Sequence, residues 1–517
     1  MEVPALPIMI ITYALLANFA GASSGSLSQY GISAPLRVMA TYPEPGNQAA
    51  TPDMGVRPYH AASYSVAANR EAGAGALPRP RYVATGGATR NVEGLRAAQG
   101  SVSGAAGDLQ YVQAAGSQIA VYSKDTARLL VGPTHINKLF YGAPPGPAIR
   151  ACRLQSVHDA AILYDHMANR WLVTYRASAR HSGIGTYYQC LAVSASADAT
   201  GSYYRYAIAL TTPTGAPQYA DDAKLAAWPG AYYVSFSLFD SASGQYAGPR
   251  MCGVERRALL AGAAAAIRCD DVGAGVAPVA PAGMEGYGAP SGDGHAVFVS
   301  LASESSALLL WRYSWRAGVL GAPNVVPVAP FLPALAPIQQ PDRGAPLAAL
   351  GDRIAARVIY RHDAGRDILV LNHTVQSRSG QASLRWYDIG DPLGTPYLVQ
   401  QGALEDGQES RFMGSIGVDK AGNIVLGYSA AAADTPPGVR YTGREAGDLP
   451  GSMQAEEVLV NGTGVHSGTG MIARATGAMA LDPIDGCTFW YTQRYVPLSG
   501  VDTWRTRIAS FRFRSCR

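Results

Sequence analysis

Charged residues, and lysine above all, are scarce in this sequence. Asp, Glu, Lys and Arg make up 15% of the 517 residues, and only four of the 41 basic residues are lysines. The formal net charge is +4, with no basic run or stripe. A nucleic-acid-binding surface needs clustered positive charge, so we expect no nucleic-acid partner. The preference for Arg, together with abundant Ala, is typical of a high-GC bacterial genome.

Long hydrophobic runs are missing as well. The one candidate, Ile8–Phe19, is too short for a comfortable transmembrane helix, so we expect no membrane span. It is followed by Ala20-Gly21-Ala22, a small-x-small cleavage site. We interpret residues 1–22 as a signal peptide, although the leading segment carries Glu2 and no basic residue. No lipobox cysteine follows, so we expect a secreted, periplasmic or cell-surface protein.

The common catalytic signatures do not occur either. There is no P-loop, no dinucleotide fingerprint in a strand-turn-helix setting, no H-E-x-x-H and no C-x-x-C. The sole G-x-S-x-G match, Gly21–Gly25, lies at the expected cleavage site rather than on a strand-to-helix elbow. The sequence therefore predicts neither a serine hydrolase nor a cofactor enzyme. We expect no cofactor, and a bound calcium ion is the alternative.

The chain does contain a short sequence motif that recurs about every sixty residues. In it an apolar strand runs into an Asp-centred turn and then into a second apolar or aromatic strand. The clearest copies are AILYDHMANRWLVTY (161–175), SIGVDKAGNIVLGYS (415–429) and MALDPIDGCTFWYT (479–492). Hairpins repeated at this period predict an all-β fold of the β-propeller type. The central Asp165, Asp419 and Asp482 are expected to bond to local backbone amides.

Seven apolar strand starts can be counted, and we expect each to begin the inner strand of one blade. They predict seven blades, with six as the alternative, and lie near Ile119, Ile162, Leu225, Val297, Val358, Ile416 and Met479. We assign residues 106–517 to the propeller and the Gly/Ala/Ser/Pro-rich residues 23–105 to a linker or strap. The final strand, 506–513, could join the N-terminal blade and close the ring. Only residues 257–266 are expected to be helical.

Six cysteines fall in three local couples. An even number of cysteines in an exported chain indicates disulfides. Sequence alone leaves fifteen connectivities open. We expect sequential pairing because each couple lies within one repeat, which gives Cys152–Cys190, Cys252–Cys269 and Cys487–Cys516.

Several sequence segments resemble those of a set of uncharacterised exported bacterial proteins that are described as propeller-like or sialidase-like. They are LYDHMANRWLVTY, CLAVSASADATGSYYRY, KLAAWPGAYYVSF, MGSIGVDKAGNIVLGYS, GVRYTGR and LDPIDGCTFWYT. The resemblance extends from Tyr111 to the C-terminus and implies an exported β-propeller, without implying a particular reaction. Where that family usually carries a Gly-Asp-Tyr stretch, this chain has ARATG at 473–477. A carboxylate of the family's central channel is therefore missing here.

A carboxylate stands just before four of the predicted inner strands: Asp159, Asp222, Asp293 and Asp352. In a propeller these positions would converge at one mouth of the central channel. Crowded carboxylates repel one another and need a cation, a shared proton or arginines nearby. Oxygen ligands of this kind suit calcium or magnesium. The alternative is structural, because Asp before a strand is a common turn residue that bonds to its own backbone.

Arginines accompany these carboxylates. Arg353 adjoins Asp352, and Arg411 and, approximately, Arg474 hold the next equivalent positions. Arg binds a carboxylate bidentately, so such a cluster could recognise a sugar acid. A network in which Asp and Arg compensate each other across the channel is equally consistent with the sequence.

The propeller repeats, the expected export signal and the Asp and Arg positions together predict a monomeric binding protein. We expect it to recognise an extracellular glycan or a protein partner through its loops. The alternative is a sialidase-like glycoside hydrolase at the channel mouth, which would need two carboxylates about 5 to 10 Å apart. Residues 196–203 (SADATGSY) approach the S-x-D-x-G-x-T-W box of sialidases. The Arg-Ile-Pro phrase is missing, however, and no Tyr–Glu nucleophile pair can be named. A purely structural surface protein is the third interpretation.

Overall fold

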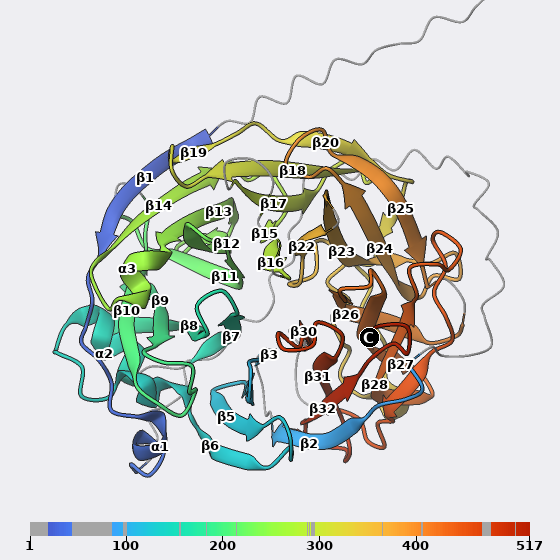
Figure 1. Ribbon diagram of the computed structural model, residues 1–517, viewed down its shortest axis with the longest axis horizontal. Helices are drawn as coiled ribbons and strands as arrows, with labels where there is room; N and C mark the ends of the chain where they lie inside the picture. The colour runs from blue at the N-terminus through green and yellow to red at the C-terminus, as the bar shows by residue number, and fades with distance from the viewer. Residues whose placement is uncertain are drawn as a thin grey trace, which may run out of the picture.

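The chain forms seven β-sheets arranged around a central axis (Figure 1). The computed structural model describes residues 19–43, 85–96, 101–154, 157–181, 184–212, 215–286, 288, 290, 295–363, 365–404, 407–467, 477–501 and 503–517. The sheets are antiparallel except for one short parallel pair. The prediction of an all-β, seven-bladed propeller is therefore confirmed. We number the blades 1 to 7 in chain order.

Blades 1 to 3 each contain four strands in simple up-and-down order, and blade 3 gains a fifth from the N-terminal segment. Blade 1 consists of β3 (Val102–Ala106), β4 (Gln110–Ala115), β5 (Gln118–Ser123) and β6 (Leu129–His135). Blade 2 consists of β7 (His158–Asp165), β8 (Arg170–His181), β9 (Ile184–Ser194) and β10 (Tyr203–Leu210). Blade 3 consists of β11 (Gln218–Ala227), β12 (Ala231–Asp240), β13 (Tyr246–Glu255), β14 (Ala265–Val272) and the added β1 (Phe19–Leu27).

Blades 4 and 5 share one inner segment, whose first part, β15, pairs in blade 4 and whose second part, β16, pairs in blade 5. Blade 4 consists of β15 (Ala280–Pro281), β17 (Ala296–Leu301), β18 (Ala307–Ser314), β19 (Val319–Leu320) and β20 (Asn324–Pro327). Blade 5 consists of β16 (Gly283–Glu285), β22 (Ile359–Asp363), β23 (Arg366–Gln376), β24 (Ala382–Gly390), β25 (Tyr397–Ala403) and the small β21 (Leu332–Pro333).

Blades 6 and 7 complete the ring, and an N-terminal strand joins the last one. Blade 6 consists of β26 (Ser410–Val418), β27 (Ile424–Ala432), β28 (Thr435–Arg444) and β29 (Glu457–Val460). Blade 7 consists of β30 (Ala478–Leu481), β31 (Phe489–Tyr495), β32 (Arg505–Phe511) and the added β2 (Arg90–Arg96). The short helices are α1 (Leu36–Met39), η1 (Ile136–Phe140), α2 (Pro147–Leu154), α3 (Arg256–Leu260) and η2 (Pro341–Arg343).

Five of the seven predicted strand starts fall on or beside strands that line the centre of the ring, and two do not. Val358 is counted with the five because β22, although second to the short β16 in blade 5, also lines the centre. Ile119 lies in β5, the third strand of blade 1, and Val297 lies in β17, the second strand of blade 4. Those two assignments are wrong. The true inner strands there, VSGAA (β3) and AP (β15), are short and consist mainly of small residues. The apolar patterns in the sequence therefore identified more hydrophobic strands that lie farther from the axis in the same blades.

The N-terminal segment covers the outer edges of three blades. β1 pairs with β14 of blade 3, and β2 pairs with β32 of blade 7 (blue strands in Figure 1). Between them, the backbone amides of Tyr30 and Ser33 donate hydrogen bonds to carbonyls of β10 in blade 2. An uncovered edge strand exposes unpaired N–H and C=O groups that invite association with other chains. The two added strands and the segment between them therefore protect these three edges.

The strand that closes the ring comes from the N-terminal end of the chain, whereas we expected it to come from the C-terminal end. The final strand β32 lies inside blade 7, between β31 and β2, and does not pair with blade 1. An N-terminal strand, β2, joins the last blade instead. The expected signal peptide lies mainly outside the described residues, which begin at Phe19.

All three sequential disulfides are present. Cys152–Cys190 fastens α2 to β9, Cys252–Cys269 links β13 to β14, and Cys487–Cys516 ties the C-terminal end to the turn after β30. The predicted pairing is confirmed. The helix expected at 257–266 is only α3, because Ala265 already begins β14 and pairs in the sheet with β1.

Candidate functional site

A cavity of about 410 Å³ runs along the propeller axis. Its walls come from the inner strands β3, β7, β11, β16, β22 and β30, the segment before β22, and two residues of blade 6. Small-molecule sites in proteins commonly enclose about 300–1,000 Å³. We call this space the central cavity. Both ends of the inner strands contribute to its lining.

Two of the predicted carboxylates, Asp159 and Asp222, line the central cavity at equivalent places in blades 2 and 3. Each lies in a β-bulge of its inner strand and has a left-handed backbone, with φ of +53° and +56°. Met413 occupies the corresponding bulge in blade 6, with φ of +54°. Asp tolerates left-handed backbone better than most residues. The repeated Asp therefore has a conformational reason in addition to any contact that its side chain makes.

The side chain of Asp222 belongs to a buried charge network on one wall. Its Oδ2 accepts hydrogen bonds from Lys224 Nζ at 2.6 Å and from Arg353 Nη1 at 3.3 Å. Arg353 Nε also donates to Asp352 Oδ1, at 2.7 Å. Burial acts to lower the pKa of Arg353, but the carboxylates of Asp352 and Asp222 together raise it above its ordinary value. Three predicted residues thus come together as a network of compensating charges.

The remaining predicted residues are placed differently. Asp159 pairs with Arg176 of β8 at 3.1 Å. Arg411 is not among the residues that line the cavity. Its guanidinium pairs with Glu456 at 2.6 Å, and Tyr428 also donates a hydrogen bond to this carboxylate. Asp293 lies outside the described residues. The cavity lining thus includes Asp159, Asp222 and Arg353.

A second charged cluster, which was not predicted from the sequence, lies on the wall of blade 5 and consists of Arg357, Glu285 and Arg361. All three line the central cavity, and Arg357 Nη2 pairs with Glu285 Oε1. In the parallel pairing of β16 with β22, Glu285 is the register partner of Arg361. The spacing of Arg353, Arg357 and Arg361 along one segment was visible in the sequence. That the cluster shares one cavity wall could not be predicted, because β16 could not be recognised as an inner strand.

Several polar atoms of this cluster lack hydrogen-bond partners. They are Arg357 Nε, Arg361 Nε and Nη1, and Glu285 Oε2. The whole Arg361 residue is 6% exposed, and the Arg357 side chain, which lines the cavity, is 30% exposed. Buried polar groups are nearly always paired, and an unpaired one costs about 1–3 kcal/mol. Unpaired donors and an unpaired acceptor at one cavity wall therefore point to a missing polar partner.

Burial shapes the electrostatics of the cluster. It lowers the pKa of Arg357 to about 10 and also lowers the pKa of Arg361, in spite of the nearby carboxylates of Asp363 and Asp419. Both guanidinium groups nevertheless remain cationic at neutral pH. Burial also lowers the pKa of His166, whose Nε2 lies 2.9 Å from the carbonyl oxygen of Gly286. An anion in the cavity would relieve the unfavourable burial of positive charge.

The Asp residues of the hairpin turns are structural, as expected. Asp165 Oδ1 accepts from the amide of Met167, Asp419 Oδ1 accepts from that of Ala421, and Asp482 Oδ1 accepts from that of Ile484. Two of them also receive a cation from the next blade. Arg256 of blade 3 pairs with Asp165 at 2.6 Å, and Lys124 of blade 1 pairs with Asp482 at 2.7 Å.

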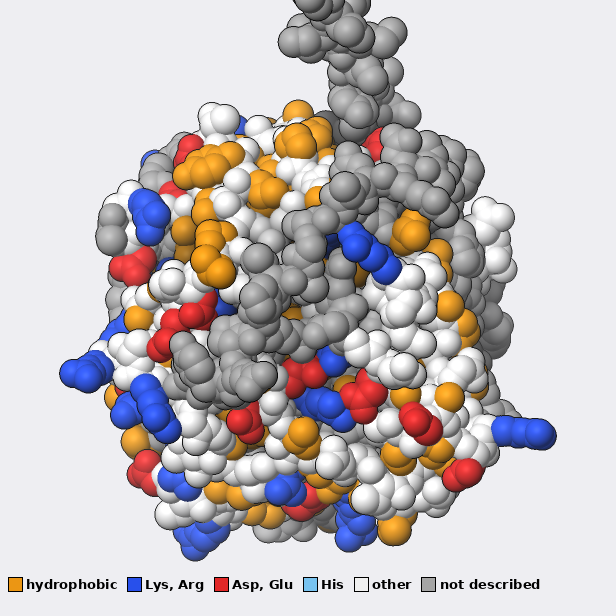
Figure 2. All heavy atoms as spheres, turned by 90° about the vertical axis from the view of Figure 1, so that its right-hand side faces the viewer, with side chains coloured by type: hydrophobic (Ala, Val, Ile, Leu, Met, Phe, Trp, Pro, Cys, Tyr) orange, Lys and Arg blue, Asp and Glu red, His pale blue; other side chains and the backbone are white. Residues whose placement is uncertain are grey.

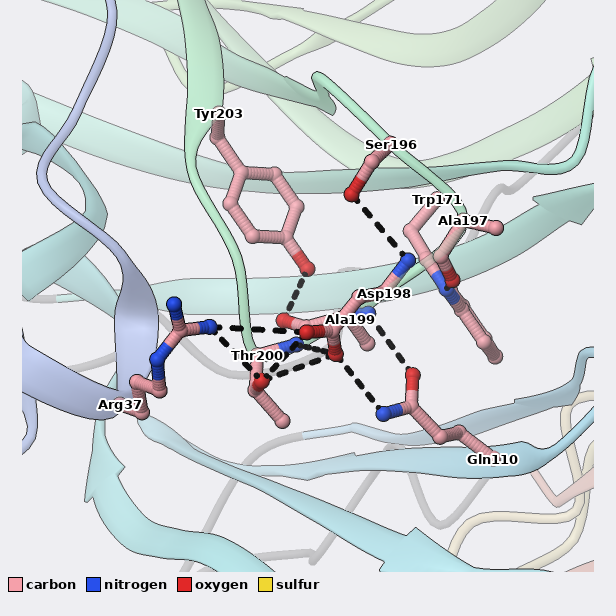
Figure 3. Close-up of polar contacts among 9 residues, drawn as sticks. All are labelled: Arg37, Gln110, Trp171, Ser196, Ala197, Asp198, Ala199, Thr200 and Tyr203. Carbon is pink, nitrogen blue, oxygen red and sulfur yellow. Dashed lines mark hydrogen bonds and ion pairs between the residues drawn. The ribbon is translucent and has the colours of Figure 1, made fainter.

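The sialidase-box-like segment forms a hydrogen-bonded turn between β9 and β10, shown in Figure 3. Asp198 Oδ1 accepts hydrogen bonds from its neighbour Thr200 and from Gln110 Nε2 of blade 1, at 2.8 Å. Arg37 of α1 approaches the same carboxylate at 3.5 Å. Burial acts to raise the pKa of Asp198, but these hydrogen bonds hold it below the ordinary value. The motif joins blade 2 to blade 1 and to the N-terminal segment.

The described residues contain no group of three or more His, Cys, Asp or Glu placed to hold a metal ion. No helix in the described part of the chain is long and apolar enough to cross a membrane. On the face shown in Figure 2, acidic and basic side chains are interspersed, with no large field of one sign.

No family model matches the sequence, and no curated protein matches it. Among solved structures, a chain of the mitotic checkpoint complex is 10% identical, with a TM-score of 0.38, covering 84% of this chain and 96% of that one. A protein of unknown function from Dyadobacter fermentans is 11% identical, with a TM-score of 0.37 and coverages of 83% and 99%. The Trypanosoma rangeli sialidase is 10% identical, with a TM-score of 0.34, covering 69% of this chain and 54% of its own. At such values the similarities give no information about function.

Proposed function

We propose that this protein binds a sugar acid, free or as a residue of an acidic glycan, in the central cavity. The observation that carries the proposal is the cluster of Arg357, Glu285 and Arg361, with its unpaired donors and acceptor at the cavity wall. Of the two partner classes that the sequence predicts, an acidic glycan fits this cluster.

The chemistry of the unpaired atoms defines what the ligand must offer. The N–H groups of Arg357 and Arg361 need acceptor oxygens, and a carboxylate matches a guanidinium in both charge and shape. Oε2 of Glu285 needs a donor, which a hydroxyl group supplies. A ligand with a carboxylate next to hydroxyl groups satisfies both requirements. Sugar acids have this arrangement, whereas neutral sugars lack the carboxylate.

The predicted residues Asp159, Asp222, Asp352 and Arg353 have a supporting part in this proposal. Asp222 and Asp159 present carboxylate oxygens at the lining, where sugar hydroxyls could donate to them. Asp352 lies behind Arg353 and holds its guanidinium in place. Arg411 has no part, because it is paired with Glu456 away from the cavity.

Binding is preferred over glycoside hydrolysis. A general acid needs a carboxyl group with a raised pKa in the cavity. Burial raises the pKa of Asp270, Asp388 and Asp419, and none of these residues is among the described residues that line the cavity. The lining places guanidinium groups beside carboxylates that pair with them, as Arg353 does with Asp222 and Arg357 with Glu285, and such paired groups serve recognition.

Export to an oxidising compartment also belongs to the proposal. Three disulfides persist where thiols are not kept reduced, as in the periplasm or outside the cell. N-terminal sequencing of protein recovered from the periplasm or medium tests this point. We expect the mature chain to begin at Ser23, which would leave Ser23–Leu27 of β1 paired with blade 3.

Isothermal titration calorimetry with glucuronate as the probe tests the binding proposal, with glucose as its uncharged analogue. We expect glucuronate to bind and glucose not to bind. Arg357→Gln should weaken glucuronate binding about ten- to a hundredfold, the value of a charged hydrogen bond. Arg316→Gln, which changes an exposed arginine outside the cavity lining, is the matched control and should have no effect. Equal binding of both sugars, or no binding of glucuronate, would contradict the proposal.

A further inference from the structure

The wall of the central cavity is largely aliphatic outside the charged clusters. Leu163 of β7, Leu225 of β11 and Leu481 of β30 all line it and are all partly exposed. These strands are the innermost strands of their blades, so the exposed surface of the three leucines faces the cavity. We call them the leucine collar. Three blades thus place the same kind of side chain around one axis.

An exposed isoleucine continues this apolar surface to the mouth at the ends of the inner strands. Ile484, in the turn after β30, is 66% exposed and lines the same cavity. Leu109, in the turn after β3, is 75% exposed. The two turns are held together by Lys124, whose Nζ donates to the carbonyl oxygen of Asp108 and to Asp482 Oδ1. These two side chains are the most exposed large apolar residues in the described part of the chain.

The apolar surface and the charged cluster line the same cavity. Met284 of β16 lines the cavity and is the chain neighbour of Glu285. A purely polar ligand would cover Arg357, Glu285 and Arg361 and would leave the leucine collar in contact with water. Removing such aliphatic surface from water is favourable by roughly 25 cal/mol per Å². The lining as a whole therefore fits a ligand with an anionic end and an apolar end.

The structure assigns an amphiphilic ligand to this cavity: a sugar acid joined to an aliphatic or aryl group. The acid end contacts Arg357 and Arg361, and the apolar end packs on the leucine collar and leaves the cavity beside Ile484. This inference rests on the proposed function, because it uses the same acid site. It adds the chemical class of the group to which the sugar is attached.

Calorimetric titration with hexyl β-D-glucuronide and with free glucuronate tests the inference. The hexyl compound should bind the intact chain at least about tenfold more tightly, because several methylene groups leave water. Ile484→Ser and Leu225→Ala should each reduce that advantage and leave the affinity for free glucuronate unchanged. Leu498→Ser removes an equally exposed leucine, 65% exposed and outside the cavity lining, and should change neither affinity.

The outcomes separate the two proposals. Equal affinity of the two glucuronides overturns the inference and leaves the acid site intact. A tenfold advantage that survives both cavity variants also overturns it, because the hexyl group would then bind elsewhere. If neither compound binds, the proposed acid site itself is contradicted. Because Leu225→Ala shortens a partly buried side chain, its melting temperature is measured first, and the exposed Ile484→Ser keeps the test valid if Leu225→Ala does not fold.

Discussion

The ammonium group of Lys124 in blade 1 lies 2.7 Å from Oδ2 of Asp482 in blade 7, so one ion pair joins the first and last blades of the ring. Both side chains are at least nine-tenths buried. Lys124 also donates to the carbonyl oxygens of Gly107 and Asp108, and Trp490 Nε1 donates to Asp482 at 3.1 Å. This buried polar network therefore joins the two ends of the propeller beside the apolar core that blades 1 and 7 share, and β2 adds the closing strand.

Lys124→Met should destabilise the protein strongly. Removing one partner of a buried ion pair leaves the other charge uncompensated and costs about 3–5 kcal/mol. Urea denaturation followed by tryptophan fluorescence measures the change in unfolding free energy. Lys420→Met is the matched control, since Lys420 is exposed, and it should stay within about 0.5 kcal/mol of the parent. Equal stability of the two variants would show that the Lys124 ion pair does not hold the ring closed.

Asp222→Ala should also destabilise, for two separable reasons. It removes the carboxylate that pairs with the buried Lys224, and it places Ala at a backbone φ of +56°. We expect a loss of about 3–5 kcal/mol in unfolding free energy. Asp222→Asn keeps a residue that tolerates left-handed backbone and should lose less. If thermal melting shows no difference between Asn and Ala, the bulge geometry does not explain why Asp is found there.

Each disulfide should contribute a few kcal/mol to stability. The closed loops span 38, 17 and 29 residues, for which the loss of chain entropy in the unfolded state gives about 3–4 kcal/mol each. The double variant Cys487→Ser with Cys516→Ser tests this without leaving a free thiol. Its melting temperature should fall below that of the parent under non-reducing conditions. Coincident melting curves would mean that the C-terminal end is held by its other contacts.

Acid should weaken the fold partly through His373. Burial, and to a smaller extent Arg385, lowers its pKa to about 3, and its Nε2 shares a hydrogen bond of 2.9 Å with the Tyr387 hydroxyl. In the unfolded chain the pKa is about 6.5. Between those values the unfolded state binds a proton that the folded state does not, so stability falls as the pH falls, by up to about 1.4 kcal/mol per pH unit.

Unfolding free energies of the parent and of His373→Gln at pH 7.5 and pH 4.5 test this prediction. The value at pH 7.5 gives the packing cost of the substitution. The difference between the two pH values should be smaller in the variant, because one proton-binding group has been removed. An identical pH dependence of the two proteins would show that His373 is protonated in the folded state.

The sequence predicted those parts of the fold that depend on local patterns. The Asp-centred hairpins, the blade number and the three disulfides all follow from features within one repeat, such as Asp165 before the turn into β8. Pairings made across the ring could not be predicted in this way. β2 joins blade 7, and the closing strand was therefore assigned to the wrong end.

In the candidate site, too, features set by local patterns could be predicted and contacts between distant segments could not. Asp222 and Asp352 could be expected to converge because they stand before inner strands at blade intervals, and Arg353 adjoins Asp352. Arg411, at a similar interval, pairs with Glu456 of its own blade instead, and the interval alone could not reveal this partner. Glu285 could not be found from the sequence, since β16 has three residues and pairs in parallel with a strand far along the chain.

A crystal structure of the protein grown with glucuronate shows most directly whether a sugar acid binds in the central cavity. We expect density for one sugar acid there, with a carboxylate oxygen about 2.7–2.9 Å from a guanidinium nitrogen of Arg357 or Arg361. A sugar hydroxyl should lie within hydrogen-bonding distance of Glu285. A cavity that contains only water at a saturating glucuronate concentration, or glucuronate bound on the outer surface alone, would contradict this expectation.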